Sequence, residues 1–460
     1  MKRITPLFAR SAIFAASLAL GFAHAPAATQ NSTERAPQIS VRPSGRVLLG
    51  DAVGVVVSNL RPGQAVVLRA TTTDTKGRRW NSSGFYRADA RGVVDTARQA
   101  SEGGTYLGVD QWGLFWSMTM AADTPEGERE PAHFQSGFAD NKRSNVVRVE
   151  AREGGRTLAG ADIELVYIAP EVTITPVREN GIVGNFHAPS AAPPRGRRWP
   201  GVIVVGGSEG GMHSANATAK LLSSRGYAVL ALAYFNMETL PAQLEEIPLE
   251  YFKRAIDWMR ANPSVDAERL AFAGSSKGGE AALLVASTYP EVKAVVAYVP
   301  AHAAFQSIRF GGQQTVKSSW SFQGRPVPFV PYAGATERHD GIRAVYLDGL
   351  GDSEAARAAL IPVERIRGPV LVISGTDDRL WPSGPMAERV VERLRKERFR
   401  FPYQHLSYEG AGHSLTAPAQ IPLAGPPSRF PLGGTDRANA NARADAFLKV
   451  VAFLDEHLKK

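Results

Sequence analysis

The stretch ERLAFAGSSKGGEAALLVAS, residues 268–287, runs from an apolar segment through a tight Gly/Ser turn into an alanine-rich helical pattern. Its glycines place Ser276 at the centre of the motif G-x-S-x-G, which is informative when a strand precedes it and a helix follows. Ser275 falls at the first variable position. The motif predicts that Ser276 is a nucleophile and that the backbone N–H of Lys277 points toward an oxyanion. The alternative is a structural turn without chemistry.

The pattern around this turn continues over much of the chain. Continuous apolar runs such as PGVIVVGG (200–207) and GPVLVISG (368–375) have the composition of buried parallel strands. Amphipathic segments such as LEYFKRAIDWMRAN (249–262) predict helices between them. This alternation predicts an α/β-hydrolase domain over residues 169–460, with a doubly wound, mostly parallel sheet covered on both faces. The Pro/Arg-rich segment 189–200 is interpreted as a surface loop of that domain.

A serine nucleophile needs a base and an acid that orients the base. In this fold the acid and then the histidine follow the serine along the chain. Asp377 and Asp378 follow a predicted buried strand, and His413 lies in a glycine-rich loop after the last one. We favour Asp378 as the acid, with Asp377 as a turn or capping residue. For His413 the alternative is an ordinary histidine of a surface loop.

The loop VVGGSEGGMHSA, residues 204–215, is expected to supply the second oxyanion donor. The candidate is the backbone N–H of Ser208 or of Gly207, and the alternative is merely a flexible turn. Neither dinucleotide-binding nor P-loop spacing is present, so phosphate binding is not expected. The remaining histidines beyond residue 27 lack metal-ligand spacing, and we expect no metal and no organic cofactor. They are His133, His187, His213, His302, His339, His405 and His457.

Residues 37–168 have a different pattern. Short segments such as QISVRPS, AVGVVVSNL, QAVVLRATTTD and NVVRVEAREGG alternate apolar and polar residues, and Gly, Pro and Asn separate them. Such a series predicts an immunoglobulin-like β-sandwich. Nothing in this region predicts catalysis.

Residues 1–27 have the parts of a secretory signal peptide. A positively charged start precedes a short apolar core at 11–23, and an A-x-A cleavage site follows at 25–27. The apolar core is too short to span a membrane. We therefore expect an exported protein, periplasmic or secreted, with a polar leader at 28–36 and no stable membrane insertion. An uncleaved anchor or a buried helix is the alternative.

The composition excludes cysteine chemistry and argues against a nucleic-acid partner. The 460 residues include no cysteine, which excludes disulfides, thiolate metal sites and a cysteine nucleophile. The formal net charge is +9, but the basic residues are dispersed along the chain. We therefore expect no nucleic-acid partner.

Beyond these patterns, the chain resembles a known family, the acyl-CoA thioesterases and bile acid-CoA:amino acid N-acyltransferases. The N-terminal part of the resemblance lies in residues 50–118. The C-terminal part lies, in order, in PGVIVVGGSEGG, RGYAVLALAYFNMETLP, LEYFKRAIDWM, GSSKGGE, IPVER, GTDDRLWPS and GAGH. The resemblance implies a catalytic triad of Ser276, Asp378 and His413. Glu280 also matches the family pattern, and for it we expect no more than a charge on the first turn of a helix.

The resemblance implies a serine thioester hydrolase with a small-molecule acyl thioester or ester as substrate. Family members that transfer acyl groups to amino acids carry cysteine at the nucleophile position. Ser276 favours hydrolysis instead, since water can resolve an oxygen-ester acyl-enzyme. The signal peptide departs from the family, because acyl-CoA is an intracellular metabolite. The alternatives are an exported carboxylesterase or lactone hydrolase, an N-acyltransferase, and a binding protein with an inactive hydrolase scaffold.

Overall fold

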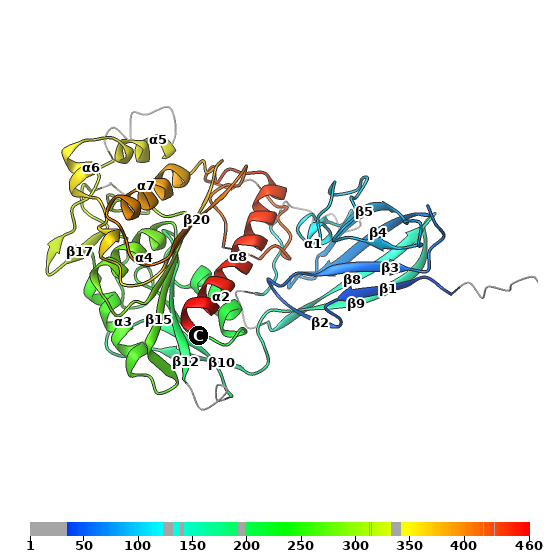
Figure 1. The fold of residues 1–460 in the computed structure, drawn as a ribbon, viewed down its shortest axis with the longest axis horizontal. Coiled ribbons are helices and arrows are strands. Elements are labelled where there is room, and N and C mark those ends of the chain that lie inside the picture. Colours follow the sequence, from blue (N-terminus) through cyan, green and yellow to red (C-terminus); the bar gives the residue numbers. More distant parts are fainter. Residues whose placement is uncertain are drawn as a thin grey trace, which may run out of the picture. The chain divides into compact units, whose positions relative to one another are not determined.

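An eight-stranded sheet forms the centre of the C-terminal part of the chain in the computed structural model (Figure 1). The strand order is β10–β11–β13–β12–β15–β16–β19–β20. The strands are β10 (Val172–Val177), β11 (Gly184–Pro189), β12 (Trp199–Val205), β13 (Ala228–Leu232), β15 (Val265–Ser275), β16 (Ala294–Tyr298), β19 (Val370–Gly375) and β20 (Tyr403–Tyr408). The six strands from β13 to β20 pair in parallel, as predicted. Antiparallel β10 and β11 extend one edge and make the sheet mixed.

The structure describes residues 35–122, 132–138, 142–191, 198–311, 313, 315–332, 342–416, 418–426 and 428–460. The predicted signal peptide, nearly all of the leader and half of the predicted loop at 189–200 therefore lie outside the described residues. Within the described part of the chain, no helix has the length and apolar character needed to cross a membrane.

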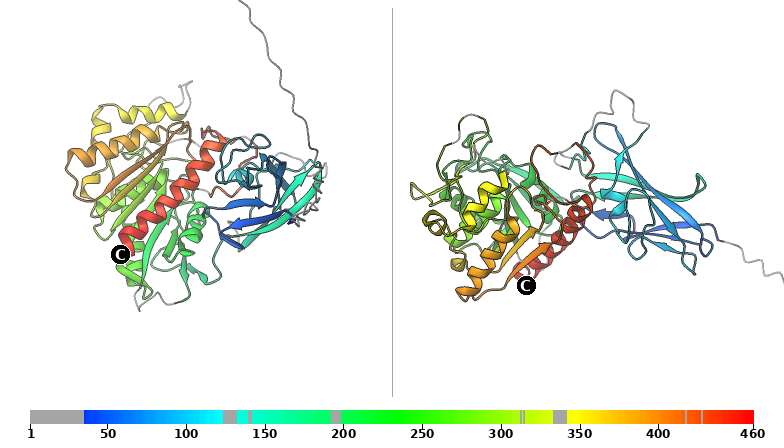
Figure 2. Two further views of the ribbon diagram at one scale, coloured as in Figure 1. Left: turned by 45° about the vertical axis from the view of Figure 1, so that its right-hand side comes forward. Right: turned by 90° about the horizontal axis from the view of Figure 1, so that it is seen from above.

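Helices cover both faces of the sheet (Figures 1 and 2). Alternate residues of β12 point to opposite faces, because side chains alternate along a strand. Val202 and Val204 join the core that contains residues of α2 and α8, whereas Ile203 and Val205 join the core that contains residues of α3, α4 and α7. These helices are α2 (His213–Ser223), α3 (Leu249–Ala261), α4 (Lys277–Thr288), α7 (Ser383–Lys396) and α8 (Asp436–Leu458).

The N-terminal strands form two further sheets. One has the order β1–β3–β6 and the other β2–β9–β8–β4–β5–β7. Their bounds are β1 (Gln38–Arg42), β2 (Arg46–Leu48), β3 (Gly54–Ser58), β4 (Ala65–Thr73), β5 (Arg79–Arg87), β6 (Val94–Asp95), β7 (Thr119–Met120), β8 (Ser144–Glu153) and β9 (Arg156–Val166). Along β4, Val66, Leu68 and Ala70 are buried while their neighbours are not, which is the alternation of a strand with one buried face. A short helix, α1 (Gly113–Trp116), lies between β6 and β7.

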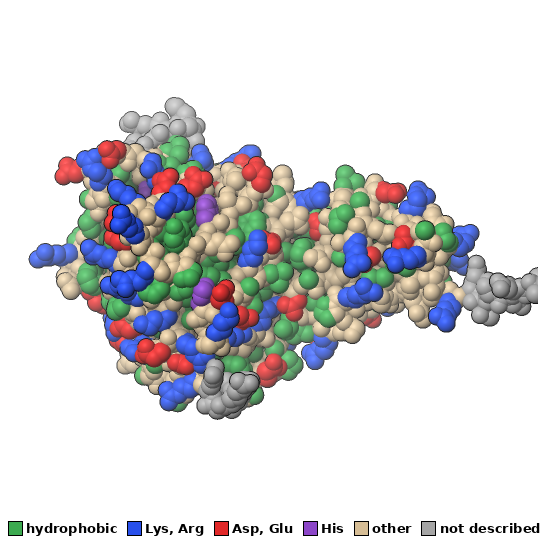
Figure 3. Space-filling view, viewed as in Figure 1, with side chains coloured by type: hydrophobic (Ala, Val, Ile, Leu, Met, Phe, Trp, Pro, Cys, Tyr) green, Lys and Arg blue, Asp and Glu red, His purple; other side chains and the backbone are tan. Residues whose placement is uncertain are grey.

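Between β16 and β19, the residues that the structure describes form only short elements. They are β17 (Trp320–Phe322), β18 (Arg325–Pro326), α5 (Ile342–Leu347), η3 (Asp348–Leu350), α6 (Glu354–Ala358) and η4 (Val363–Arg365). β17 pairs with β18 and with β14 (Ile247–Pro248) in a small sheet. Basic and acidic side chains are interspersed on the face of the molecule drawn in Figure 3, as their dispersal along the sequence predicts.

Candidate active site

Ser276 stands at a sharp bend between β15 and α4. Its backbone angles are φ 58° and ψ −123°, a conformation that is strained for a residue with a side chain. The glycines on either side leave room for the bend. A Cβ on Gly274 would lie 2.0 Å from the Gly278 carbonyl oxygen, and one on Gly278 would lie 2.1 Å from that of Gly206. The predicted strand–turn–helix geometry is therefore present, and the Ser276 side chain is half-buried at its corner.

Lys277 is the first residue of α4. The N–H groups at the start of a helix have no acceptor within the helix, so the backbone N–H of Lys277 is free to bind an anion beside Ser276. This is the position in which the sequence predicts the first oxyanion donor.

His413 and Asp378 form a buried pair. His413 Nδ1 lies 2.8 Å from Asp378 Oδ2, and only 8% of the histidine and 3% of the aspartate are exposed. The other carboxylate oxygen, Oδ1, accepts the backbone N–H groups of Leu380 and Trp381 at 3.0 and 3.2 Å. The backbone N–H of His413 donates to the Leu432 carbonyl at 2.7 Å. A carboxylate fixed in this way keeps the proton on Nδ1 and leaves Nε2 available as a base.

Asp377 faces other partners. Its carboxylate accepts Arg379 Nε at 2.9 Å and the backbone N–H of Gly434 at 3.0 Å. These hydrogen bonds hold the pKa of Asp377 below its usual value, with Arg379 the larger cause. Asp377 thus holds a turn together, while its neighbour Asp378 faces the histidine.

The structure brings His413 and Asp378 together and presents Ser276 at the bend. Among the described residues, no hydrogen bond joins Ser276 Oγ to the His413 ring. Catalytic hydrogen bonds of ligand-free enzymes are often long and tighten only when substrate binds. The joint action of the three residues remains a prediction.

The loop after β12 passes directly beside Ser276. A Cβ on Gly207 would lie 3.1 Å from Ser276 Cβ and 2.9 Å from Glu209 Oε2. The Glu209 carboxylate accepts a hydrogen bond from Ser214 Oγ. Both predicted candidates for the second oxyanion donor, Gly207 and Ser208, therefore belong to a loop that is adjacent to the predicted nucleophile.

Two residues at this loop were not singled out from the sequence, although both lie in segments that resemble the family. Tyr234, just after β13, places its hydroxyl 2.9 Å from the carbonyl oxygen of Gly207 and 3.1 Å from that of Gly206. Glu209 has an exposed side chain beside the same glycines. The position of Tyr234 in the predicted fold could have indicated a place near the site. Tyr234 follows the carboxyl end of a predicted strand, where sites in such sheets form.

Glu280 lies on the first turn of α4 as expected, but it does more than place a charge there. Its side chain is fully buried, and both carboxylate oxygens lie 2.9 Å from Lys277 Nζ. Glu280 Oε1 also accepts Trp320 Nε1 at 2.6 Å and the backbone N–H of Phe305 at 3.1 Å. The sequence did not reveal this role, because Phe305 and Trp320 lie far along the chain from the helix.

The described histidines other than His413 form no metal centre. Among the described residues, no group of three or more His, Cys, Asp or Glu side chains could hold a metal ion. Burial lowers the pKa of His187 and of His302 to about 4, so both are neutral at pH 7. His339 lies outside the described residues.

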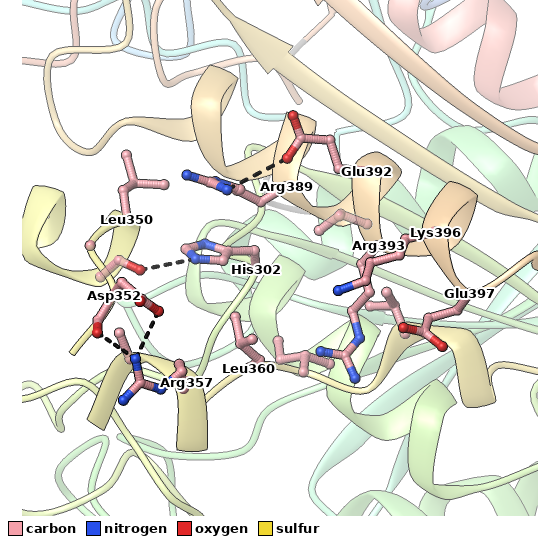
Figure 4. Close-up of a pocket in the computed structure, with 16 residues that line it drawn as sticks. His302, Leu350, Asp352, Arg357, Leu360, Arg389, Glu392, Arg393, Lys396 and Glu397 are labelled. Atoms are coloured by element: carbon pink, nitrogen blue, oxygen red, sulfur yellow. Dashed lines mark hydrogen bonds and ion pairs between the residues drawn. The ribbon is translucent and has the colours of Figure 1, made fainter. Parts of the chain in front are cut away.

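A separate cavity of about 380 Å³ contains His302 in its wall (Figure 4). The His302 ring bonds a backbone carbonyl at 3.0 Å. Asp352 and Arg357 form an ion pair on one side of it, and Arg389 and Glu392 form another on the opposite side. Four basic and three acidic side chains line this cavity, and none of the predicted catalytic residues does.

Comparison with known proteins gives the family. Residues 247–460 match the model of the BAAT / Acyl-CoA thioester hydrolase C terminal, and residues 50–179 match that of the Acyl-CoA thioester hydrolase/BAAT N-terminal region. Acyl-coenzyme A thioesterase 1 of Mus musculus is 31% identical over 428 residues, which are 91% of this chain and 96% of that protein. The chain belongs to the acyl-CoA thioester hydrolase/BAAT family.

Other members of the acyl-CoA thioester hydrolase/BAAT family match it over a similar length. Peroxisomal succinyl-coenzyme A thioesterase of Mus musculus is 31% identical over 92% of this chain and 97% of that protein. Among solved structures, an esterase of Pyrobaculum calidifontis has a TM-score of 0.38 and 18% identity, covering 62% of this chain and 85% of that one. The eight-stranded mixed sheet, with helices on both faces and a sharp bend at Ser276, has the architecture of an α/β-hydrolase.

Proposed function

We propose that the protein hydrolyses acyl thioesters through an acyl-enzyme on Ser276. The observation that carries this proposal is the buried His413–Asp378 pair in a chain whose predicted nucleophile sits at a strained strand–helix bend. Membership of a family whose curated relatives are named acyl-coenzyme A thioesterases supports the choice of substrate class, a small-molecule acyl thioester.

The mechanism follows from the placement of these groups. As Ser276 Oγ attacks the acyl carbonyl, His413 Nε2 takes its proton, and Asp378 stabilises the imidazolium. The backbone N–H of Lys277, together with that of Ser208 or Gly207, binds the oxyanion of the tetrahedral intermediate. The C–S bond then breaks and the thiolate takes the proton from His413. Water, deprotonated by His413, attacks the acyl-enzyme, and release of the acid regenerates Ser276.

Three finer points belong to the same proposal. Hydrolysis is favoured over transfer to an amine because the proposed nucleophile is a serine, and water can resolve its oxygen-ester acyl-enzyme. The pattern of residues 1–27 supports action after export, on an ester or thioester found outside the cytoplasm. The two N-terminal sheets, with their shared apolar core, support an immunoglobulin-like sandwich over residues 37–168.

Replacement of Ser276 by alanine tests the proposal, and Ser275 offers a matched control in the same turn. Ser276→Ala should lower turnover by roughly 10⁴–10⁶-fold, because the acyl-enzyme cannot form. Ser275→Ala should stay near the wild-type rate. The assay compares acyl-CoA thioesters with p-nitrophenyl esters of the same acyl groups. Wild-type turnover by pure Ser276→Ala protein would remove this residue from the mechanism, and preference for the oxygen esters would favour a carboxylesterase.

A further inference from the structure

The hydroxyl of Tyr234 lies under the loop that follows β12. The residue is 1% exposed, and its hydroxyl donates to the backbone of that loop, 2.9 Å from the Gly207 oxygen and 3.1 Å from the Gly206 oxygen. A buried tyrosine hydroxyl requires a partner. Here the hydroxyl proton of Tyr234 is shared between two consecutive carbonyl groups of the same loop.

These two carbonyls determine the direction of two N–H groups. A trans peptide is planar, so its N–H points away from its carbonyl oxygen. The carbonyl of Gly206 shares its peptide plane with the N–H of Gly207, and the carbonyl of Gly207 shares its plane with the N–H of Ser208. When Tyr234 holds both oxygens on its side, both N–H groups are directed to the other side of the loop.

The side chains of this part of the loop do not orient these peptides. Gly206 and Gly207 have no side chains to pack, and neither has room for one: a Cβ on Gly206 would lie 2.5 Å from Glu209 Oε1. The glycine backbone itself allows more peptide orientations than that of other residues, including one that turns a carbonyl toward Ser276. A carbonyl in that position would repel an oxyanion rather than stabilise it. The hydrogen bonds to Tyr234 oppose such a flip.

The ring of Tyr234 is itself fixed. It packs against Phe235, Phe252 and Trp320 with centroid distances of 5.1, 5.7 and 5.8 Å. Burial raises the pKa of Tyr234 well above its usual value, and the nearby carboxylates of Glu209 and Glu280 raise it further. The hydroxyl therefore stays protonated and in one position, as a donor must.

We propose that Tyr234 is a positioning residue of the oxyanion hole: its hydroxyl holds the carbonyls of Gly206 and Gly207 so that the N–H groups of Gly207 and Ser208 face the reacting carbonyl at Ser276. This inference rests on the proposed function. Tyr234 touches neither the substrate nor the reacting atoms, and acts only through the loop.

The test removes the hydroxyl alone, as Tyr234→Phe. The expected result is a fall in kcat of about 10–100-fold with KM unchanged, less than the 10²–10³-fold loss typical when a direct oxyanion donor is removed. Affinity for an alkylboronic acid, which forms a tetrahedral adduct with a serine, should fall by a similar factor. Affinity for a non-hydrolysable acyl-CoA thioether should not change.

Tyr251 provides the matched control. It is also buried, and its hydroxyl donates to a backbone carbonyl, that of Ala233 at 2.5 Å, but within the described part of the chain it makes no hydrogen bond to the loop after β12. Tyr251→Phe should lose comparable stability to urea and keep its kcat. The proposal is overturned if Tyr234→Phe loses no more kcat than Tyr251→Phe, or if its loss lies in KM.

The activity of Ser276→Ala distinguishes a failure of the proposed role of Tyr234 from a failure of the proposed function. An inactive Ser276→Ala beside an unimpaired Tyr234→Phe would reject the role of Tyr234 and leave the proposed function intact. An active Ser276→Ala would reject both.

Discussion

Asp377 and Asp378 are neighbours in one turn, yet their carboxylates face different partners. Asp377 bonds Arg379 and the backbone of Gly434, whereas Asp378 bonds His413. A shift of one position would leave the histidine without its orienting acid. At the scale of single residues, the candidate site therefore depends on Asp378, and not Asp377, facing His413.

The buried histidines predict an acid-sensitive fold. The folded pKa of His187 and that of His302 are about 4, below the usual 6.5, because burial disfavours their charged forms. Between pH 6.5 and 4 the unfolded chain binds protons that the folded chain does not. The free energy of unfolding should therefore fall as pH drops through this window, by up to about 3 kcal/mol per histidine.

Urea unfolding at pH 7.5, 5.5 and 4.5 measures this dependence. His187→Gln keeps a neutral side chain that can bond Asn216, and should flatten the pH profile. The same substitution at the exposed His213 should leave the profile unchanged. Equal slopes for the two variants would contradict the assignment.

At the scale of elements, α4 contains a buried ion pair, and the carboxylate of this pair also bonds the chain between β16 and β19. Lys277 and Glu280 are 1% and 0% exposed at their side chains, and Glu280 also holds the indole of Trp320 and the backbone of Phe305. Burial lowers the pKa of Lys277, although the charge of Glu280 opposes this effect. The first turn of α4, which follows Ser276, is thus bonded through Glu280 to Phe305 and Trp320.

This ion pair should show strong coupling. Glu280→Gln alone leaves a buried ammonium without its counter-charge and should cost about 3–5 kcal/mol of unfolding free energy. The double variant Lys277→Met/Glu280→Gln removes both charges and should cost less than the sum of the single changes. Urea unfolding of the two single variants and the double variant gives the coupling.

The surface pair Lys253–Asp257 supplies the comparison for that measurement. Asp257→Asn should change the unfolding free energy by less than about 1 kcal/mol, because the pair is exposed. Strict additivity of the Lys277 and Glu280 changes would refute the coupling.

At the scale of the molecule, the N-terminal sheets and the C-terminal sheet share one apolar core. This core includes Val55 and Leu68 of the N-terminal sheets as well as Val204 of the C-terminal sheet. Gln420 links the two parts by accepting the backbone N–H of Gly50 at 3.1 Å and donating to the carbonyl of Asp51 at 2.6 Å. The two parts should therefore unfold together.

Gln420→Ala tests this linkage. The change leaves two backbone groups without partners and should lower the free energy of unfolding by about 2 kcal/mol. The exposed Gln404 gives a control, and Gln404→Ala should change it by less than about 0.5 kcal/mol. Circular dichroism and tryptophan fluorescence should report one coincident urea transition. An earlier, separate transition of the wild-type N-terminal sheets would show that the parts are independent.

Much of the fold was predictable because its signals are local. A continuous apolar run, a turn and an amphipathic helix each depend on residues that are close in sequence, and the six parallel strands were found in this way. The edge strands β10 and β11 were not assigned as an antiparallel extension, because their place is decided by pairing with β13 rather than by their own residues. The structure places His413 beside Asp378, the aspartate favoured as the acid, whereas the residues alone left Asp377 open.

The sequence by itself determined the bend at Ser276, because a few glycines and the backbone sterics of one turn suffice for it. It also determined the chain order of serine, acid and histidine. Only the tertiary structure decided that Tyr234 bonds the loop after β12 and that Glu280 is buried against Trp320. Those contacts join residues 27 to 40 positions apart. Burial and long-range hydrogen bonds depend on which segments meet, and no local pattern records that.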